Sequence, residues 1–179
     1  MKKVAIVSST LRPNGNSEFL AKACERGAKE AGNEVEFISL KGKTVNYCIG
    51  CLACQRIGKC VLKDDVNELL ETIKNADVLV FATPIYYYEM SGQLKTFLDR
   101  LNPLFPTDYK FRKVYMIATA ADDGEYVFEK AYNGLLGWVD CFEKAQLCGL
   151  VTGGGLTDAG EAKNDEDAIK RAYELGKSL

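Results

Sequence analysis

The chain has 179 residues, of which 47% are hydrophobic and 27% charged, with a formal net charge of -2. This length fits one domain, and the composition excludes a disordered or collagen-like chain. Because there is no basic excess, no nucleic-acid partner is expected. No apolar run approaches the roughly 20 residues of a membrane span, and the stretch Met1–Val7 does not resemble a signal peptide. We therefore expect a cytoplasmic protein with no membrane span.

Apolar runs of strand length alternate with helical patterns along the chain. The predicted strands cover residues 3–8, 34–40, 77–83, 113–118 and 146–151, and the predicted helices cover residues 17–31, 64–74, 91–101, 127–143 and 166–177. This alternation predicts a parallel sheet with helices on both faces. Five strands in a chain of this size favour the flavodoxin-like, doubly wound order. We expect one α/β domain over residues 1–179, with a five-stranded parallel sheet and a cysteine-rich loop at 44–62.

Ligands of such a sheet bind beyond the carboxyl ends of the strands, so the loops after the first, third and fourth strands are the candidates. The first loop, residues 8–17, brings hydroxyls, one guanidinium and a glycine to the start of a helix. Together with the backbone N–H groups there, these donors predict a site for a phosphate monoester. Neither a P-loop motif nor GxGxxG is present. The alternative is that Asn16 or Ser17 only caps the helix.

The second loop, residues 83–92, places a proline and three tyrosines after the third strand. This loop predicts a flat apolar wall for a planar ring. The alternative is an aromatic cluster against the next helix or a partner subunit, and three successive tyrosines cannot all point inward. The third loop, residues 119–124, is small enough for its backbone to approach a ligand, although an ordinary loop would look the same.

The numbers of histidines and cysteines limit which metal sites and general bases the chain can form. The chain has no histidine, which excludes a histidine general base and every histidine-containing metal site. Four of its seven cysteines, Cys48, Cys51, Cys54 and Cys60, follow a C-x2-C-x2-C-x5-C pattern that is typical of [4Fe–4S] ligation. A zinc site, a dithiol switch and inert packing are the alternatives. Cys24, Cys141 and Cys148 fall in predicted helices and strands, and we expect them to be buried.

The loops together resemble those of the NADPH-dependent FMN reductase group of flavodoxin-like proteins. Thr10-Leu11-Arg12 and Gly15-Asn16-Ser17 match its first loop, GS-x-R-x-x-GN-[ST], although Ser9 stands where the family usually has glycine. Residues 76–100 are similar to its second flavin loop and the helix after it. The four cysteines, followed by Asp64-Asp65, look like the motif of the iron–sulfur flavoprotein branch. The resemblance covers about the first 120 residues well.

The resemblance implies an FMN site. Around the FMN phosphate it implies Ser9, Thr10, Arg12, Asn16 and Ser17. Along the isoalloxazine ring it implies Pro84, Ile85, Tyr86 and Tyr87, with Thr119 and Ala120 at the other edge. The metal ligands it implies are Cys48, Cys51, Cys54 and Cys60, for a [4Fe–4S] cluster that not every relative need hold.

The implied function is an FMN-dependent oxidoreductase that passes electrons from NAD(P)H to a quinone, a small molecule or a protein. The flavin itself would perform the hydride and electron transfer. Hydride transfer to a flavin needs no protein base, which fits a chain without histidine. One alternative is an iron–sulfur flavoprotein that exchanges single electrons with ferredoxin. Another is a thiol or zinc sensor on a flavodoxin-like scaffold. The resemblance also implies a homodimer or homotetramer.

Overall fold

The computed structural model describes all residues from 1 to 179. The strands are β1 (Lys3–Ser8), β2 (Glu34–Ser39), β3 (Val78–Tyr86), β4 (Glu89–Met90), β5 (Lys113–Thr119) and β6 (Gln146–Gly153). The α-helices are α1 (Asn16–Glu30), α2 (Ala53–Ile57), α3 (Val66–Asn75), α4 (Gly92–Arg100), α5 (Glu129–Val139) and α6 (Glu166–Ser178). Short 3-10 turns cover Asn102–Leu104, Glu125–Phe128 and Glu161–Asn164.

Five of the strands pair in parallel, in the order β2-β1-β3-β5-β6. This confirms the predicted doubly wound order, in which the chain changes direction across the sheet between β1 and β3. The sixth strand, β4, was not predicted; it has two residues and folds back antiparallel on the end of β3. The loops after β1 and β3 are therefore neighbours at one edge of the sheet, as the candidate site requires.

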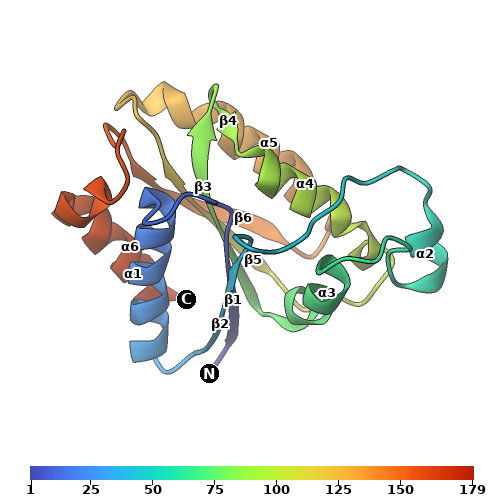
Figure 1. The fold of residues 1–179 in the computed structure, drawn as a ribbon. Coiled ribbons are helices and arrows are strands. Elements are labelled where there is room, and N and C mark those ends of the chain that lie inside the picture. Colours follow the sequence, from blue (N-terminus) through green and yellow to red (C-terminus); the bar gives the residue numbers. More distant parts are fainter.

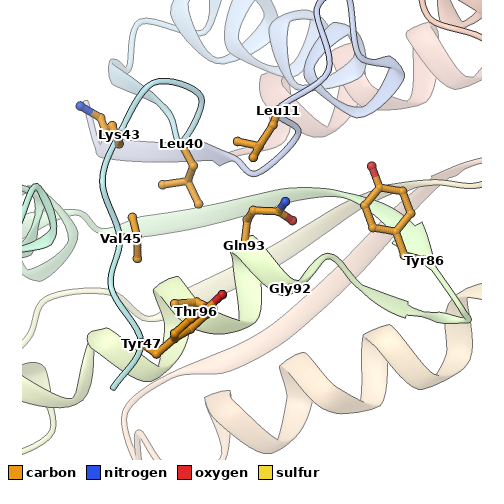
Figure 2. A pocket seen from close by; sticks show the side chains of 9 residues that line it. All are labelled: Leu11, Leu40, Lys43, Val45, Tyr47, Tyr86, Gly92, Gln93 and Thr96. Carbon is orange, nitrogen blue, oxygen red and sulfur yellow. The ribbon is translucent and has the colours of Figure 1, made fainter. Parts of the chain in front are cut away.

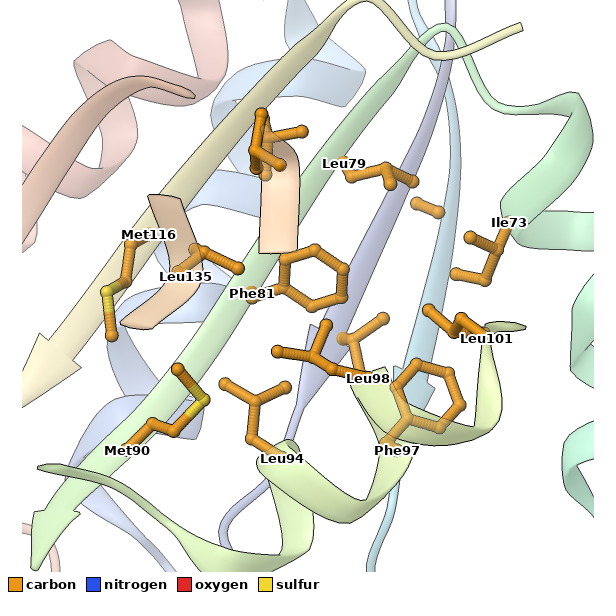
Figure 3. Close-up of a cluster of buried hydrophobic side chains, with 14 of the residues drawn as sticks. Ile73, Leu79, Phe81, Met90, Leu94, Phe97, Leu98, Leu101, Met116 and Leu135 are labelled. Atoms are coloured by element: carbon orange, nitrogen blue, oxygen red, sulfur yellow. The ribbon is translucent and has the colours of Figure 1, made fainter. Parts of the chain in front are cut away.

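Helices cover both faces of the sheet (Figure 1): α1 and α6 lie on one face, and α3, α4 and α5 on the other. Strands of this kind are apolar along their length because both of their faces are buried. On the larger face, Phe81 of β3 lies at the centre of the core, against Leu98 of α4 and Leu135 of α5 (Figure 3). The sequence pattern predicts this layer well, because each helix contributes apolar residues at helical spacing.

The contact between α1 and α6 depends on two glycines. A Cβ at Gly27 would lie 2.1 Å from the carbonyl oxygen of Tyr173, and a Cβ at Gly176 would lie 2.0 Å from that of Cys24. No side chain fits in either position, so the two helix backbones approach closely. This close packing joins the second half of α1 to the C-terminal helix.

Two sequence predictions about cysteines are wrong. The predicted helix over 127–143 is a 3-10 turn followed by α5, and it ends at Val139. Cys141 therefore falls in a turn and is exposed. Cys148 is also exposed because β6 is an edge strand that is only partly covered. Cys24 is buried, as expected. None of the helices combines the length and the apolar character needed to cross a membrane.

Candidate functional site

The loop after β1 leads directly into α1. Gly15 precedes the helix in an extended conformation, and no side chain caps it. The alternative reading, in which Asn16 or Ser17 serves only as a cap, is therefore wrong. A Cβ at Gly15 would lie 2.5 Å from Oγ1 of Thr10. Glycine at this position lets the helix start pack directly on the buried Thr10 side chain.

Ser17 provides a buried hydroxyl without a partner. Its Oγ has no hydrogen-bond partner within the protein, and the residue is 1% exposed. It lies in the first turn of α1, where the backbone N–H groups have no acceptors within the helix. An orphaned buried donor is costly unless something pairs with it. The position, the dipole of α1 and the free donors together fit a phosphate group.

Ser9 differs from its neighbours, because its donors are already used. Both its N–H and its hydroxyl donate to the carbonyl oxygen of Ala82, at 2.9 and 3.0 Å. The hydroxyl of Ser91 in turn donates to Ser9 Oγ, and the N–H of Ser91 donates to Thr83 Oγ1. These contacts hold the loop after β1 against the end of β3 and the start of α4. Ser9 therefore supports the loop and has no free donor for a ligand.

Arg12 and Asn16 contact a segment that the sequence did not single out. Nη1 of Arg12 donates to the carbonyl of Thr157 at 2.8 Å, and Nη2 lies 3.7 Å from the carboxylate of Asp158. The side-chain amide of Asn16 donates to the carbonyl of Asp158 at 2.8 Å and accepts from the N–H of Ala162. The loop over residues 156–162 therefore borders the start of α1 on its outer side. No local sequence pattern shows such a long-range contact.

The predicted aromatic wall begins at the end of β3. The strand continues to Tyr86, and Tyr87 and Tyr88 then turn back into β4 with φ of 51° and 66°. Left-handed backbone at two bulky residues is strained, and such strain often accompanies a function. Tyr88 packs 6.1 Å from the ring of Tyr126, whereas Tyr87 is 98% exposed. The expectation that the three tyrosines do not all point inward is confirmed.

A cavity of about 470 Å³ joins the two loops (Figure 2). Leu11 closes one side of it, next to Thr10, and Tyr86 closes another. Gln93 reaches in from the start of α4 (Figure 2). The first turns of α4 also line the cavity, with Gly92 and Thr96. A third wall is formed by the end of β2 and the start of the cysteine-rich loop, with Leu40, Lys43, Val45 and Tyr47. The size is that of an ordinary ligand pocket, and this third wall was missed by the sequence analysis.

Thr119 and Ala120 lie outside this cavity. Both are buried, and the backbone of Ala120 is fully hydrogen-bonded, because its N–H donates to Gly153 and its carbonyl accepts from Leu156.

In the turn that follows Ala120, the side chains of Tyr126 and Asp122 form a hydrogen bond. The Tyr126 hydroxyl donates to Asp122 at 2.8 Å, which raises the pKa of Tyr126. The N–H of Gly124 and then the Tyr126 hydroxyl lower the pKa of Asp122.

The cysteine-rich loop, residues 44–62, extends away from the sheet and carries the short helix α2 (Figure 1). Cys48 and Cys51 are exposed, Cys54 is buried and Cys60 is half-buried. Four thiols are the right donors for a [4Fe–4S] cluster. Their arrangement does not fit, because no three of the cysteine and acidic side chains are gathered closely enough to share a metal ion.

Comparison with known proteins identifies the family. Residues 1–140 match the family described as NADPH-dependent FMN reductase. The chain belongs to the NADPH-dependent FMN reductase family. It is accordingly an NAD(P)H-dependent FMN oxidoreductase. Two features described above fit FMN: the orphaned hydroxyl of Ser17 at a helix start, and the cavity that Leu11 and Tyr86 border.

Individual relatives agree with this assignment. The reductase chain is 34% identical to an iron-sulfur flavoprotein of Methanocaldococcus jannaschii, over 99% of its own length and 95% of the relative. It is 36% identical to an iron-sulfur flavoprotein of Archaeoglobus fulgidus, over 100% of its length and 94% of the relative. Its fold matches an NAD(P)H:quinone oxidoreductase from Methanothermobacter marburgensis with a TM-score of 0.74 at 20% identity, over 99% and 96% of the two chains.

Proposed function

We propose that this reductase holds the FMN phosphate at the start of α1 and the isoalloxazine ring against the wall after β3. The single observation that carries the phosphate site is the buried hydroxyl of Ser17, which has no partner within the protein. Thr10 and the free N–H groups of the first turn complete a set of donors. Asn16 and Arg12 take part from the outer side, where they tie the loop over residues 156–162 to the site.

The ring would lie along Pro84, Ile85, Tyr86 and Tyr87, at the mouth of the cavity. The backbone hydrogen bonds of Ala120 are already made, so in this proposal Thr119 and Ala120 contribute packing at the far edge of the ring and no hydrogen bond. FMN, when bound, supplies hydride acceptance and electron release. The protein's own part is to orient the ring, to cover one of its faces and to leave the cavity side open for a nicotinamide and then an acceptor.

For the acceptor we propose a quinone or another small planar molecule. The cavity supports this choice because Leu11, Leu40, Val45 and Tyr47 give it apolar walls. Gln93 and Lys43 add a few polar groups that could contact carbonyl oxygens of the acceptor. Assembly as a homodimer or homotetramer belongs to the same proposal, and the fully exposed Tyr87 supports it.

The second candidate is an iron–sulfur flavoprotein that exchanges single electrons with a ferredoxin-like partner. The similarity to iron-sulfur flavoproteins of Methanocaldococcus jannaschii and Archaeoglobus fulgidus favours it, as does the spacing of the four cysteines. In this conformation the sulfurs are not gathered, so ligation by Cys48, Cys51, Cys54 and Cys60 would require the cysteine-rich loop to close. A zinc or thiol sensor on the same scaffold remains the third candidate.

One preparation tests these candidates together. The protein is purified without oxygen, its visible spectrum is recorded, and FMN, iron and sulfide are assayed on the same sample. Flavin bands with turnover of NAD(P)H and a quinone support the proposal. Iron and sulfide in addition to flavin favour the second candidate. Stoichiometric zinc without flavin favours the third, and a folded protein that refuses added FMN would overturn the flavin site.

Ser17→Ala tests the phosphate site directly. Loss of one hydrogen bond to a charged group should weaken FMN binding by about tenfold or more. Ser178→Ala is the matched control, because that hydroxyl is exposed and bonds only to Leu175 at the end of α6. The site is wrong if both variants bind FMN as tightly as the wild type in a fluorescence titration.

A further inference from the structure

A second cavity, of about 390 Å³, lies beside the start of α1. It is bordered by the first two turns of α1, by Lys41 just beyond the end of β2, and by residues 159–163 after β6. It shares no lining residue with the cavity of Figure 2. Because lysines dominate its polar groups, we call it the lysine pocket.

The lysine pocket has a local excess of positive charge. Lys22, Lys41 and Lys163 line it, against one carboxylate, that of Glu18, although the whole chain has a net charge of -2. Lys22 is held by Glu25 at 2.8 Å. Nζ of Lys41 lies 3.8 Å from Glu18, which is too far for a hydrogen bond. Lys163 is exposed and takes part in no ion pair. Lys41 and Lys163 therefore have donors left for an anion.

Two further groups of the pocket suit a larger molecule than a simple anion. Oε2 of Glu18 is buried and has no hydrogen-bond partner, so it is a free acceptor for a hydroxyl group. The half-buried ring of Phe19 gives the pocket a flat apolar surface. Lysines for a phosphate, an acceptor for a hydroxyl and a ring for a base together fit a phosphorylated nucleoside.

The lysine pocket adjoins the cavity along two segments of the chain. In the turn after β1, Leu11 lines the cavity and Asn14 lines the pocket. After β2, Leu40 and Lys43 line the cavity (Figure 2), whereas Lys41 lines the pocket. Consecutive Cα atoms are about 3.8 Å apart, so the two hollows meet between Leu40 and Lys41. A long ligand with one end in the cavity can therefore extend into the pocket.

We propose that the lysine pocket receives the phosphorylated adenosine end of NADPH while the nicotinamide end stands in the cavity. Lys41 and Lys163 bind the 2′-phosphate, Glu18 accepts from a ribose hydroxyl, and Phe19 packs against the adenine. These residues then set a preference for NADPH over NADH, because NADH lacks the 2′-phosphate. The inference rests on the function proposed above, in which the cavity admits a nicotinamide.

Binding is measured without turnover, on FMN-loaded protein, by calorimetric titration. The probe is 2′,5′-ADP, which is the phosphorylated adenosine end of NADPH. Its isomer 5′-ADP, which has no 2′-phosphate, and inorganic phosphate are titrated separately. The test variants are Lys163→Gln and the double variant K41Q/K163Q. Lys170→Gln is the matched control for the first, because Lys170 is exposed on α6 and lines neither the cavity nor the pocket.

The wild type and Lys170→Gln should bind 2′,5′-ADP equally, and more tightly than 5′-ADP or phosphate. Lys163→Gln should bind it about three- to tenfold more weakly, and K41Q/K163Q about tenfold or more, because hydrogen bonds between charged groups are lost. The ratio of kcat/KM for NADPH to that for NADH should fall by similar factors. Equal melting temperatures of the variants show that the loss is not one of folding.

Three results would overturn the inference. One is equal affinity of the wild type for the three probes, which would make the pocket a general anion site. Another is release of FMN by 2′,5′-ADP, which would make it the phosphate site of FMN itself. The third is full affinity for 2′,5′-ADP in K41Q/K163Q. Failure of the flavin site is distinguished from all of these, because the FMN content is measured before each titration.

Discussion

The hydroxyl of Ser91 donates to the hydroxyl of Ser9 across 3.0 Å in the buried centre of the molecule. Ser91 also accepts from the N–H of Leu94, and so it caps α4. Ser91 thus joins the loop after β1 and the start of α4 through its side chain, and the end of β3 through its N–H. This contact holds the loop after β1 beside the helix that borders the cavity.

Ser91→Ala should therefore lower the free energy of unfolding by about 1–3 kcal/mol, because a buried hydroxyl partner and a helix cap are lost together. The same change should weaken FMN binding, because the loop after β1 loses its support. Urea unfolding and flavin titration measure the two effects. Ser178→Ala, on the surface, should change stability by no more than about 0.5 kcal/mol. Equal stability of the two variants would show that the Ser9–Ser91 contact is unimportant.

Gly176→Ala should destabilise the protein by about 1–3 kcal/mol or more, because the new methyl group meets the backbone of α1 and cannot be accommodated by a side-chain movement. Gly137→Ala is the opposite case. Its Cβ would meet nothing within 4 Å on helix α5, so it should stabilise the protein by up to about 1 kcal/mol. Thermal unfolding distinguishes the two, and the packing argument fails if they shift the melting temperature in the same direction.

Acid should break the buried ion pair at the base of the cysteine-rich loop, in which Nη1 and Nη2 of Arg100 donate to the carboxylate of Asp64 at 2.5 and 2.9 Å. Burial alone would raise the pKa of Asp64, but the hydrogen bonds from Arg100 and Asn46 and the charge of Arg100 outweigh it and lower this pKa. The unfolded-state pKa is about 3.9. The resulting stabilisation is therefore present above about pH 4 and disappears as the pH falls through the lower, folded-state pKa.

Unfolding measured from neutral to acid pH checks this. The wild type should lose a component of stability below about pH 4 that D64L/R100M lacks, because the double variant has no carboxylate to protonate there. If the two curves run parallel over this range, Asp64 does not contribute in the way that the ion pair indicates.

Cysteine labelling under native conditions should sort the thiols by burial. Burial, and to a smaller extent Glu25, raises the pKa of Cys24 to about 12. Its thiol should remain unlabelled by iodoacetamide at about pH 8, because the thiolate is the reactive form. The exposed thiols should react fast: Cys48, Cys51, Cys141 and Cys148. Peptide mass mapping shows which cysteines carry the label at each time. Early labelling of Cys24 would contradict the burial described for it.

The sequence predicts the framework of the fold, because the three central strands β1, β3 and β5 are largely apolar runs, and because the helices have clear apolar faces. It also places the loops after β1 and β3 together, since the strand order requires it. It does not reveal the contacts of Arg12 and Asn16 with residues 156–162, which join parts of the chain more than 140 positions apart.

The surroundings of individual serine and cysteine side chains are also hard to predict from the sequence. Ser9 looks like a phosphate donor in the sequence, and only the carbonyl of Ala82 shows that its hydroxyl is taken. Cys141 and Cys148 look like core residues because cysteine is often buried. Their exposure depends on where α5 ends and on β6 being an edge strand, neither of which local periodicity determines.

Helix α4 spans the distance between the cavity and the base of the cysteine-rich loop. Its first turns border the cavity with Gln93 and Thr96, and its last residue, Arg100, closes the base of the cysteine-rich loop. Nine helical residues span about 13 Å, so the length of α4 sets the distance between the cavity and the base of the cysteine-rich loop. Val45 and Tyr47 belong to both regions, since they line the cavity and are the chain neighbours of Asn46, whose carbonyl accepts from Arg100. If a ligand in the cavity changes the affinity of the loop for a second ligand, the second ligand must change the affinity of the cavity by the same factor.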